Sequence, residues 1–415
     1  MEVINKSKLA SRSIREWQQL DGSIRTKVIQ AMADKLEENT AKILAANQLD
    51  TELAVTNGIS KALLDRLTLT HERIAGMAQG LRDVSKLPDP IGQVITGVLL
   101  PNGLKIEKVR VPIGVIGMIY EARPNVTADA AGLCLKAGNA VILRGGSEAI
   151  NSNCIIVQVL REALVEHELS PEILQVIENT DRKEVRQMMR LNQYIDVIIP
   201  RGGTGLIEMV LQNSTVAVIE TGVGNCHIYV DETADLQSAV EIIKNAKVQR
   251  PGVCNAVETV LVNQTIAQSF LPRLYQALTA EGVTIRGCKL TKSIIKEIDL
   301  ADEDDWKTEY LDLILAVKIV STTAEALAHI DCYGSRHSEA IITESYQNAQ
   351  EFLKNVDAAA VYVNASTRFT DGAQFGMGAE IGISTQKLHA RGPMGLNELT
   401  TFKYMVYGSG NIRIE

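Results

Sequence analysis

Apolar residues recur at every third or fourth position through most of the first hundred residues of the chain. This spacing places the apolar side chains on one face of a helix. It predicts four helices, over residues 10–20, 24–39, 40–50 and 60–84. Residues 94–100 and 104–111 then have the pattern of two strands on either side of Asn102-Gly103, a dipeptide typical of hairpin turns. We expect this long ribbon to stand outside the main sheet and to dock on a neighbouring subunit.

From residue 114 the pattern changes to short apolar runs that alternate with helical periodicity. The expected strands are residues 115–119, 140–143, 173–177, 195–200 and 216–220, and the expected helices are residues 127–137, 147–166, 182–191 and 205–212. Such alternation is typical of a parallel, doubly wound sheet with both faces covered by helices. A second α/β segment begins after Asp231 with a helix over residues 236–247, and the chain ends on a strand-like piece, residues 400–414. The predicted fold class is therefore α/β.

The composition is that of an ordinary globular protein, with 46% hydrophobic and 22% charged residues among 415. A net charge of −8 argues against nucleic-acid binding. No apolar run approaches the roughly 20 residues that cross a bilayer, and residues 1–7 lack the apolar core of a signal peptide. Six scattered cysteines indicate a reducing compartment, and no CxxC or HExxH string suggests a metal site. We therefore expect a cytoplasmic enzyme that binds neither metal, membrane nor nucleic acid.

Cys254 stands on a loop between a predicted helix and a strand-like run, residues 257–262. A Pro-Gly turn precedes it, and Arg250 supplies a cation that favours the thiolate, the form in which a cysteine acts as a nucleophile. Most intracellular cysteines are small buried hydrophobes, and Cys134 and Cys154 fit that description because they lie on apolar helical stretches. The loop context makes Cys254 the candidate nucleophile, with a purely structural role as the alternative.

Two strand-to-helix junctions share one sequence pattern: an arginine, two glycines and a hydroxyl residue. They are Arg144-Gly145-Gly146-Ser147 and Arg201-Gly202-Gly203-Thr204. Free N–H groups at the start of a helix, beside an arginine, form an anion cradle. Such glycines are also common in tight turns, and the G-x-G-x-x-G string of dinucleotide-binding sheets is absent from both junctions. Two similar junctions on one sheet favour a cofactor that carries phosphate.

Other polar residues at strand ends or in loops leave two interpretations open. Glu220 ends a predicted strand in a glycine-rich stretch, where it serves as a general base or as a solvated acid. Asn125 precedes a helix, where helix capping is favoured over oxyanion stabilisation. Arg336 and His337 form a basic loop, which favours anion contact or loop hydrogen bonds over metal ligation. The basic glycine turn at Arg391 is similarly ambiguous.

The order of these features along the chain resembles that of the aldehyde dehydrogenase superfamily. The matching positions are Asn125, Arg144, residues 201–205, Glu220, Cys254 and Glu309. Within the superfamily, the chain is similar to the γ-glutamyl phosphate reductase family, and residues 220–227, 249–255 and 320–341 are the strings that carry this likeness. The resemblance covers nearly the whole chain.

The resemblance implies an aldehyde-dehydrogenase-like fold with a Rossmann-type parallel-sheet domain that binds NADPH or NADP. This domain is expected over residues 1–228, with residues 365–397 returning to it. A second α/β domain, residues 229–364, is expected to carry the catalytic cysteine. Residues 94–111 and 398–415 are expected to be oligomerisation strands of a homodimer or homotetramer.

The resemblance also assigns roles to single residues. Cys254 matches the nucleophile, and Asn125 together with the backbone N–H of Cys254 matches the oxyanion hole. Glu309 matches the carboxylate that contacts the nicotinamide ribose. Arg144 stands where the superfamily has a lysine at the adenosine ribose, and Ser147 stands near the glutamate of NAD-selective members, which implies NADPH. The remaining cofactor positions are the junction residues Gly145, Gly146, Gly202, Gly203 and Thr204.

The implied reaction is the NADPH-dependent reduction of L-glutamyl 5-phosphate to L-glutamate 5-semialdehyde in proline biosynthesis, through a Cys254 thioester and with release of phosphate. Glu220 matches the base that oxidising members use for hydrolytic deacylation, a step that this reduction does not need. Arg336, His337 and Arg391 are candidates for holding the phosphate or the substrate carboxylate. The alternatives are a hydrolytic NAD(P)-dependent aldehyde dehydrogenase and an assembly subunit for glutamate kinase, a partner that an active reductase could also bind.

Overall fold

The computed structural model describes residues 1–413, with the side chains of residues 61 and 62 excepted. The chain forms two compact units. Unit 1 comprises Met1–Thr221, Gly376–Gly382 and Met394–Glu415, and unit 2 comprises Gly222–Phe375 and Ile383–Pro393. The roles predicted for the two domains stay predictions at this point.

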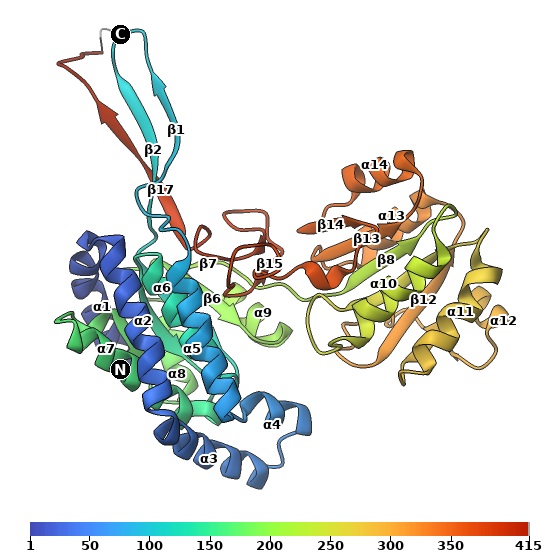
Figure 1. Cartoon of the computed structure of the whole chain (residues 1–415), viewed down its shortest axis with the longest axis horizontal. Coiled ribbons are helices and arrows are strands. Elements are labelled where there is room, and N and C mark those ends of the chain that lie inside the picture. Colours follow the sequence, from blue (N-terminus) through green and yellow to red (C-terminus); the bar gives the residue numbers. More distant parts are fainter. Residues whose placement is uncertain (414–415) are drawn as a thin grey trace. The chain divides into compact units, whose positions relative to one another are not determined.

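Five helices open unit 1 (Figure 1): α1 Glu2–Gln19, α2 Gly22–Glu38, α3 Thr40–Thr56, α4 Lys61–Leu67 and α5 His71–Lys86. The prediction of one helix over residues 60–84 is wrong, because α4 and α5 are separate helices. The side chain of Thr70 accepts a hydrogen bond from the N–H of Arg73 and starts α5 as its N-cap. Asn47 of α3 fixes the break before it, since it donates to the carbonyl of Leu67 and accepts from the N–H of Leu69. Among all the helices of residues 1–413, none is long and apolar enough to span a bilayer.

The sheet of unit 1 has five parallel strands in the order β5-β4-β3-β6-β7. The strands are β3 Val115–Tyr120, β4 Ala140–Arg144, β5 Leu174–Val176, β6 Val197–Arg201 and β7 Ala217–Val218; α6 Pro124–Lys136, η1 Ser147–Ala149, α7 Ile150–Glu166, η2 Pro171–Ile173, α8 Arg182–Met188 and α9 Thr204–Asn213 connect them. All residues of β3 and β4 are buried, which confirms the predicted parallel, doubly wound arrangement. The chain runs from β3 outward to β5 and then crosses back to β6, so β3 and β6 flank the switch point at which such sheets bind ligands.

A three-stranded antiparallel ribbon completes unit 1, in the order β1-β2-β17. Its strands are β1 Val94–Leu99, β2 Lys105–Pro112 and β17 Thr400–Tyr407. The predicted hairpin is confirmed, and Gly103 has a φ of +86° in its turn, a conformation that favours glycine. The ribbon projects away from the helices and sheet of unit 1 (Figure 1), and it exposes large apolar side chains: Val94, Val98, Leu99, Phe402, Tyr404, Val406 and Tyr407. The strand predicted over residues 400–414 ends at Tyr407, and residues 414 and 415 lie outside the described residues.

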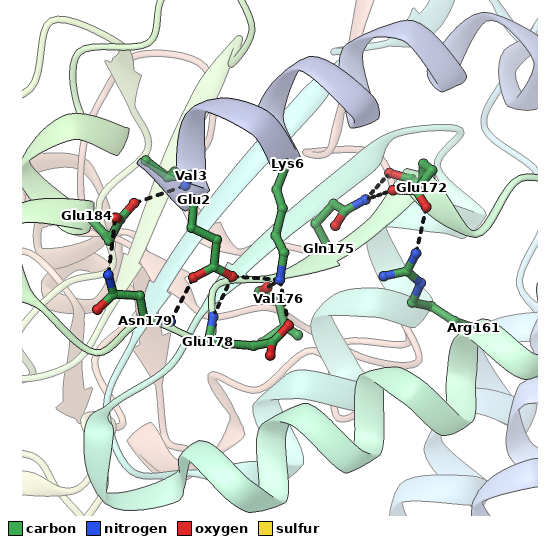
Figure 2. Close-up of polar contacts among 10 residues, drawn as sticks. All are labelled: Glu2, Val3, Lys6, Arg161, Glu172, Gln175, Val176, Glu178, Asn179 and Glu184. Atoms are coloured by element: carbon green, nitrogen blue, oxygen red, sulfur yellow. Dashed lines mark hydrogen bonds and ion pairs between the residues drawn. The ribbon is translucent and has the colours of Figure 1, made fainter.

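The first helix is fixed to the carboxyl end of β5 by a network of charged groups (Figure 2). Lys6 Nζ lies 2.6 Å from a carboxylate oxygen of Glu2 and 2.7 Å from one of Glu178. It also donates to the carbonyl oxygen of Val176 at 2.6 Å. Glu2 in turn accepts hydrogen bonds from the N–H groups of Glu178 and Asn179. These contacts fix the start of the loop between β5 and α8.

Unit 2 is built on a seven-stranded parallel sheet in the order β11-β10-β12-β9-β8-β13-β14. Its strands are β8 Cys226–Val230, β9 Val257–Asn263, β10 Thr284–Gly287, β11 Asp299–Leu300, β12 Ile314–Val320, β13 Ser338–Ile342 and β14 Ala360–Val363. Its helices are α10 Leu236–Val248, α11 Ala267–Thr279, α12 Lys289–Ile294, α13 Thr323–Tyr333, α14 Tyr346–Asn355 and the short η3 Thr367–Phe369; the antiparallel pair β15 Ile383–Ser384 and β16 Gly392–Pro393 ends the unit. Successive strand residues point to opposite faces. In β8, Ile228 and Val230 therefore pack with α10 and α11, whereas Tyr229 packs with α13 and α14.

Candidate active site

Cys254 lies in a loop between α10 and β9 of unit 2, the Cys254 loop (residues 249–256). An ion pair between Lys247 and Glu258 closes the base of this loop, with Nζ and Oε2 2.5 Å apart and both side chains fully buried. Cys254 itself is half-buried. The thiol is therefore carried on a short loop whose two ends are held together.

The backbone of Cys254 is held by β8 and by the glycine turn before it. The Cys226 thiol donates to the carbonyl oxygen of Cys254, with Sγ and O 3.2 Å apart. Gly224 packs so closely that a Cβ there would lie 1.5 Å from the same oxygen, so only glycine fits. The Gly224 N–H donates to Glu309 Oε1 at 2.8 Å, and burial raises the pKa of Glu309. The structure thus brings Glu309 to the turn that supports Cys254.

Two arginines lie at the Cys254 loop, and the sequence pointed only to Arg250. Arg368, in η3, donates from Nε to Gln249 Oε1 at 2.8 Å and from Nη1 to Asn255 Oδ1. Because Gln249 and Asn255 lie on opposite sides of Cys254 in the chain, Arg368 spans the loop. No sequence pattern near Cys254 predicts the contact with Arg368, because Arg368 comes from a turn after the last strand of the sheet.

The basic residues predicted to bind substrate occupy two places in unit 2. His337 is fully buried against β8, with Nδ1 3.8 Å from the sulfur of Cys226. Arg391 forms an ion pair with Asp357 at 2.7 Å. Arg336 lines a small cavity together with Asp357. His337 is therefore close to the strand that supports Cys254, whereas Arg336 and Arg391 gather at Asp357, and their binding roles stay predictions.

Unit 1 contains a cavity of about 430 Å³ at the carboxyl ends of β3 and β4. Its lining includes Arg144, Gly146 and Ser147 of the first glycine junction, and Arg182 and Arg186 of α8. A volume of this size lies in the usual range of small-molecule sites. The structure brings three predicted cofactor residues together and adds two arginines that the sequence did not single out, because α8 has the pattern of an ordinary polar helix.

The three arginines of this cavity differ in burial and in their partners. Arg144 is 9% exposed, and its guanidinium donates to the carbonyls of Gly145 at 2.6 Å and Thr180 at 2.7 Å. Burial lowers the pKa of Arg144. Arg182 and Arg186 are exposed, and neither side chain forms a hydrogen bond or ion pair with any residue that the structure describes. Arg144 therefore ties the first junction to the loop after β5, whereas Arg182 and Arg186 are available to an anion.

The second junction holds an anionic group of the protein itself, the carboxylate of Glu121. The N–H of Gly203 donates to Glu121 Oε2 at 3.1 Å, just before Thr204 begins α9. A Cβ on Gly202 would lie 2.6 Å from the carboxyl carbon of Glu121, so glycine leaves the space in which this carboxylate lies. A carboxylate thus occupies the kind of cradle that the sequence predicted for a phosphate.

Asn125 and Glu220, the remaining predicted catalytic residues, both belong to unit 1. Asn125 is exposed in the first turn of α6, and its Nδ2 donates to Asp129 Oδ2 at 3.2 Å. The second amide hydrogen is left for another acceptor. Glu220 is half-buried and lies two residues before Gly222, where unit 2 begins. Their roles as oxyanion donor and as base stay predictions.

The aldehyde dehydrogenase family matches the chain over residues 1–285. The chain is 61% identical over 413 residues to a γ-glutamyl phosphate reductase of Caldanaerobacter subterraneus. The matched residues cover 100% of both proteins. The chain belongs to the aldehyde dehydrogenase family, among the γ-glutamyl phosphate reductases. A γ-glutamyl phosphate reductase of Caldicellulosiruptor bescii is 57% identical over 99% of each chain.

Solved structures agree with this family assignment. The crystal structure of a γ-glutamyl phosphate reductase from Thermotoga maritima matches with a TM-score of 0.98 and 52% identity over 100% of both chains. An acetylating aldehyde dehydrogenase from Geobacillus thermoglucosidasius is only 17% identical but matches with a TM-score of 0.73, over 100% of this chain and 98% of its own. The aldehyde-dehydrogenase-like α/β fold expected of a γ-glutamyl phosphate reductase is therefore confirmed.

Aldehyde dehydrogenases work with a nicotinamide cofactor, and an engineered glycolyl-CoA reductase of the same fold, 16% identical, has been solved with bound NADP⁺. The cavity of unit 1 suits the phosphate-bearing half of such a cofactor. It lies beside the first glycine junction, contains two exposed arginines without partners among the described residues, and has the buried Arg144 Nε still without a hydrogen-bond acceptor. The residues of this cavity therefore fit the phosphate groups of a nicotinamide dinucleotide.

Proposed function

We propose that this reductase converts L-glutamyl 5-phosphate to L-glutamate 5-semialdehyde and phosphate with NADPH, the second step of proline biosynthesis from glutamate. The observation that carries the proposal is the 61% identity, over the full length of both chains, to a protein named γ-glutamyl phosphate reductase. The Cys254 loop supports it, because the base and backbone of this loop are held in place while the thiol is only half-buried.

Cys254 acts first in this proposal. Its thiolate sulfur forms a bond to the acyl carbon of glutamyl phosphate, the carbon–oxygen bond to phosphate breaks, and phosphate leaves with the bonding electron pair. The product is a thioester on Cys254, formed without water. NADPH, when bound, supplies the hydride that reduces this acyl group. The thiohemiacetal oxyanion on Cys254 then expels the sulfur, which releases the semialdehyde and restores the Cys254 thiolate.

Three further residues are assigned roles around this step. Asn125 donates a hydrogen bond to the oxyanion that forms at the acyl carbon, and one such donor contributes about 3 kcal/mol. Asn125→Ala is therefore expected to lower kcat about 100-fold. Glu309 holds the nicotinamide ribose, and its bond from Gly224 links that contact to the turn beneath Cys254. Glu220 has no water to activate in this reaction, so Glu220→Gln is expected to retain most of the activity.

Arg182 and Arg186 favour NADPH over NADH in this proposal, because a 2′-phosphate dianion supplies the acceptor that both guanidinium groups lack. Replacing both with alanine is expected to weaken NADPH binding about 10–100-fold and to change NADH binding little. Cofactor fluorescence on the free protein measures both affinities. Arg190→Ala, an exposed arginine outside the cavity lining, is the matched control. An equal loss for NADPH and NADH would contradict this assignment.

The remaining proposals concern three basic residues, the apolar surface of the ribbon and a partner enzyme. Arg336, His337 and Arg391 are proposed to hold charged groups of the substrate. The exposed apolar side chains of the ribbon are proposed to join copies of the chain into a dimer or tetramer. A glutamate kinase is proposed as a partner, because it would deliver the unstable acyl phosphate directly. The six free cysteines are consistent with a cytoplasmic, reducing environment.

The test of the proposal is the reverse reaction, the reduction of NADP⁺ by glutamate semialdehyde with and without inorganic phosphate. The wild type is expected to turn over only when phosphate is present, because phosphate must release the acyl group from Cys254. Cys254→Ala is expected to be inactive under both conditions. Sustained turnover without phosphate would favour a hydrolytic aldehyde dehydrogenase, and an active Cys254→Ala enzyme would refute the nucleophile.

A further inference from the structure

Arg368 places a guanidinium group across the Cys254 loop. Its Nε lies 2.8 Å from Gln249 Oε1 and its Nη1 bonds to Asn255 Oδ1, so the side chain is anchored on both sides of Cys254. The turn that carries Arg368 is anchored as well, since Thr367 Oγ1 donates to the carbonyl oxygen of Asn255 at 2.7 Å. Nη2 makes no hydrogen bond to any residue in the described part of the chain. The guanidinium therefore keeps one NH₂ group for a ligand.

A second guanidinium group, that of Arg250, lies within electrostatic reach of the first. Burial lowers the pKa of Arg368, and the charge of Arg250 lowers it further, whereas Asp371 and Cys254 raise it. Arg250 is exposed and forms no ion pair with the residues that the structure describes. These two cations repel each other, and an anion bound between them would remove that repulsion.

We propose that Arg368 and Arg250 bind the phosphate that leaves when Cys254 attacks the acyl phosphate, and that they bind inorganic phosphate in the reverse reaction. This inference rests on the proposed function. In the forward step the sulfur–carbon bond forms, the carbon–oxygen bond breaks, and the electron pair stays on the phosphate oxygen. Guanidinium N–H groups suit this oxygen, because they contact neighbouring phosphate oxygens in a planar, charge-assisted geometry.

Two other basic groups of unit 2, Arg391 and Lys387, already have a carboxylate partner. Arg391 and Lys387 both form ion pairs with Asp357, each at 2.7 Å. Arg368, by contrast, donates two hydrogen bonds to neutral side-chain oxygens of the Cys254 loop. Its positive charge is therefore not neutralised by these partners. A neutral partner positions the arginine without neutralising it, which is what a phosphate subsite at Cys254 requires.

The deciding measurement is the KM for inorganic phosphate in the reverse reaction with NADP⁺ and glutamate semialdehyde. Arg368→Ala is expected to raise this KM about 10–100-fold, the effect of losing hydrogen bonds to a charged group. The KM for the semialdehyde is expected to change less than about twofold, since that substrate carries no phosphate. Arg368→Lys is expected to recover part of the phosphate affinity, because it keeps the charge but not the planar fork. Arg250→Ala is expected to raise the phosphate KM as well.

Arg273→Ala removes an exposed arginine from α11 and is the matched control, expected to leave both KM values unchanged. If Arg368→Ala lowers kcat but keeps the wild-type KM for phosphate, Arg368 only shapes the loop and the inference is overturned. If Arg368→Ala loses its circular dichroism signal, an unchanged phosphate KM in Arg368→Lys and Arg250→Ala overturns it instead. Wild-type turnover that needs no phosphate would refute the proposed function itself, before any variant is compared.

Discussion

Removing the carboxylate of Glu258 is expected to destabilise unit 2 strongly. Lys247 and Glu258 are both 0% exposed and lie 2.5 Å apart, and Glu258 Oε1 also accepts the N–H of Leu311 at 3.3 Å. Burial raises the pKa of Glu258 to about 7 and lowers the pKa of Lys247, so desolvation opposes both charges and their mutual attraction has to offset it. Glu258→Gln keeps the shape of the side chain but leaves Lys247 without its counter-charge.

The size of this destabilisation follows from the complete burial of both side chains. Breaking a buried ion pair by removing one partner costs about 3–5 kcal/mol, because the other charge stays buried and unpaired. Glu258→Gln is therefore expected to lower the free energy of unfolding by about 3–5 kcal/mol. The double variant Lys247→Met/Glu258→Leu is expected to be about as stable as the wild type, because no charge then has to be desolvated.

Urea denaturation followed by circular dichroism measures these differences. The matched control is the exposed pair formed by Lys244, also on α10, and Glu281, which likewise lie 2.5 Å apart. Glu281→Gln is expected to cost at most about 1 kcal/mol, since solvent screens this pair. The buried pair does not have this effect if Glu258→Gln is no more destabilising than Glu281→Gln, or if the double variant is as unstable as Glu258→Gln.

Three further predictions concern the glycine turn, a buried histidine and the ribbon. Gly224→Ala would place a Cβ 1.5 Å from the carbonyl oxygen of Cys254, so steady-state kinetics are expected to show a kcat at least about 100-fold lower. Gly76→Ala is the control: its Cβ would meet no atom within 4 Å, so it is expected to keep the wild-type kcat. Burial lowers the pKa of His329 to about 3, below the 6.5 of an unperturbed histidine, so its contribution to stability is complete above pH 6.5 and is lost as the pH falls towards 3. In urea denaturation between pH 6 and pH 4, the wild type is expected to lose about 1.4 kcal/mol per pH unit more than His329→Phe, and equal slopes would contradict this. Deleting the chain from Thr400 onward, or introducing Tyr404→Glu on the exposed face of β17, is expected to yield monomers on a sizing column, and an unchanged elution volume would count against the ribbon as the contact between subunits.

The layers of the fold were predictable because burial leaves a local imprint on the sequence. The runs that form β3 and β4 are apolar up to Arg144 at the end of β4, as expected of strands covered on both faces. The ribbon was predictable because Asn102-Gly103 supplies the residue types that its turn needs. The break between α4 and α5 was not, because it depends on Asn47, a side chain of another helix that bonds the backbone at the end of α4 and within the break.

The residues of the candidate site differ in the same way, because some stand in a recognisable local string and others depend on a distant partner. Cys254 was recognisable from its own loop, and Arg144 and Ser147 from a glycine junction, because each stands in a distinctive local string. Arg368 and the Lys247–Glu258 pair were not recognisable, because a charged residue does not encode which distant group it will meet. These partners depend on how the strands are arranged in the sheet, and only the fold brings them to the Cys254 loop.

In the proposed reaction, Cys254 carries the acyl group between phosphate and hydride. The most direct test incubates the wild type with glutamate semialdehyde and NADP⁺ in the absence of phosphate, followed by mass spectrometry of the peptide that contains Cys254. We expect a single burst of NADPH, one per active site, and a mass gain of one glutamyl group on Cys254 that disappears when phosphate is added. An unmodified Cys254, or steady production of NADPH without phosphate, would contradict it.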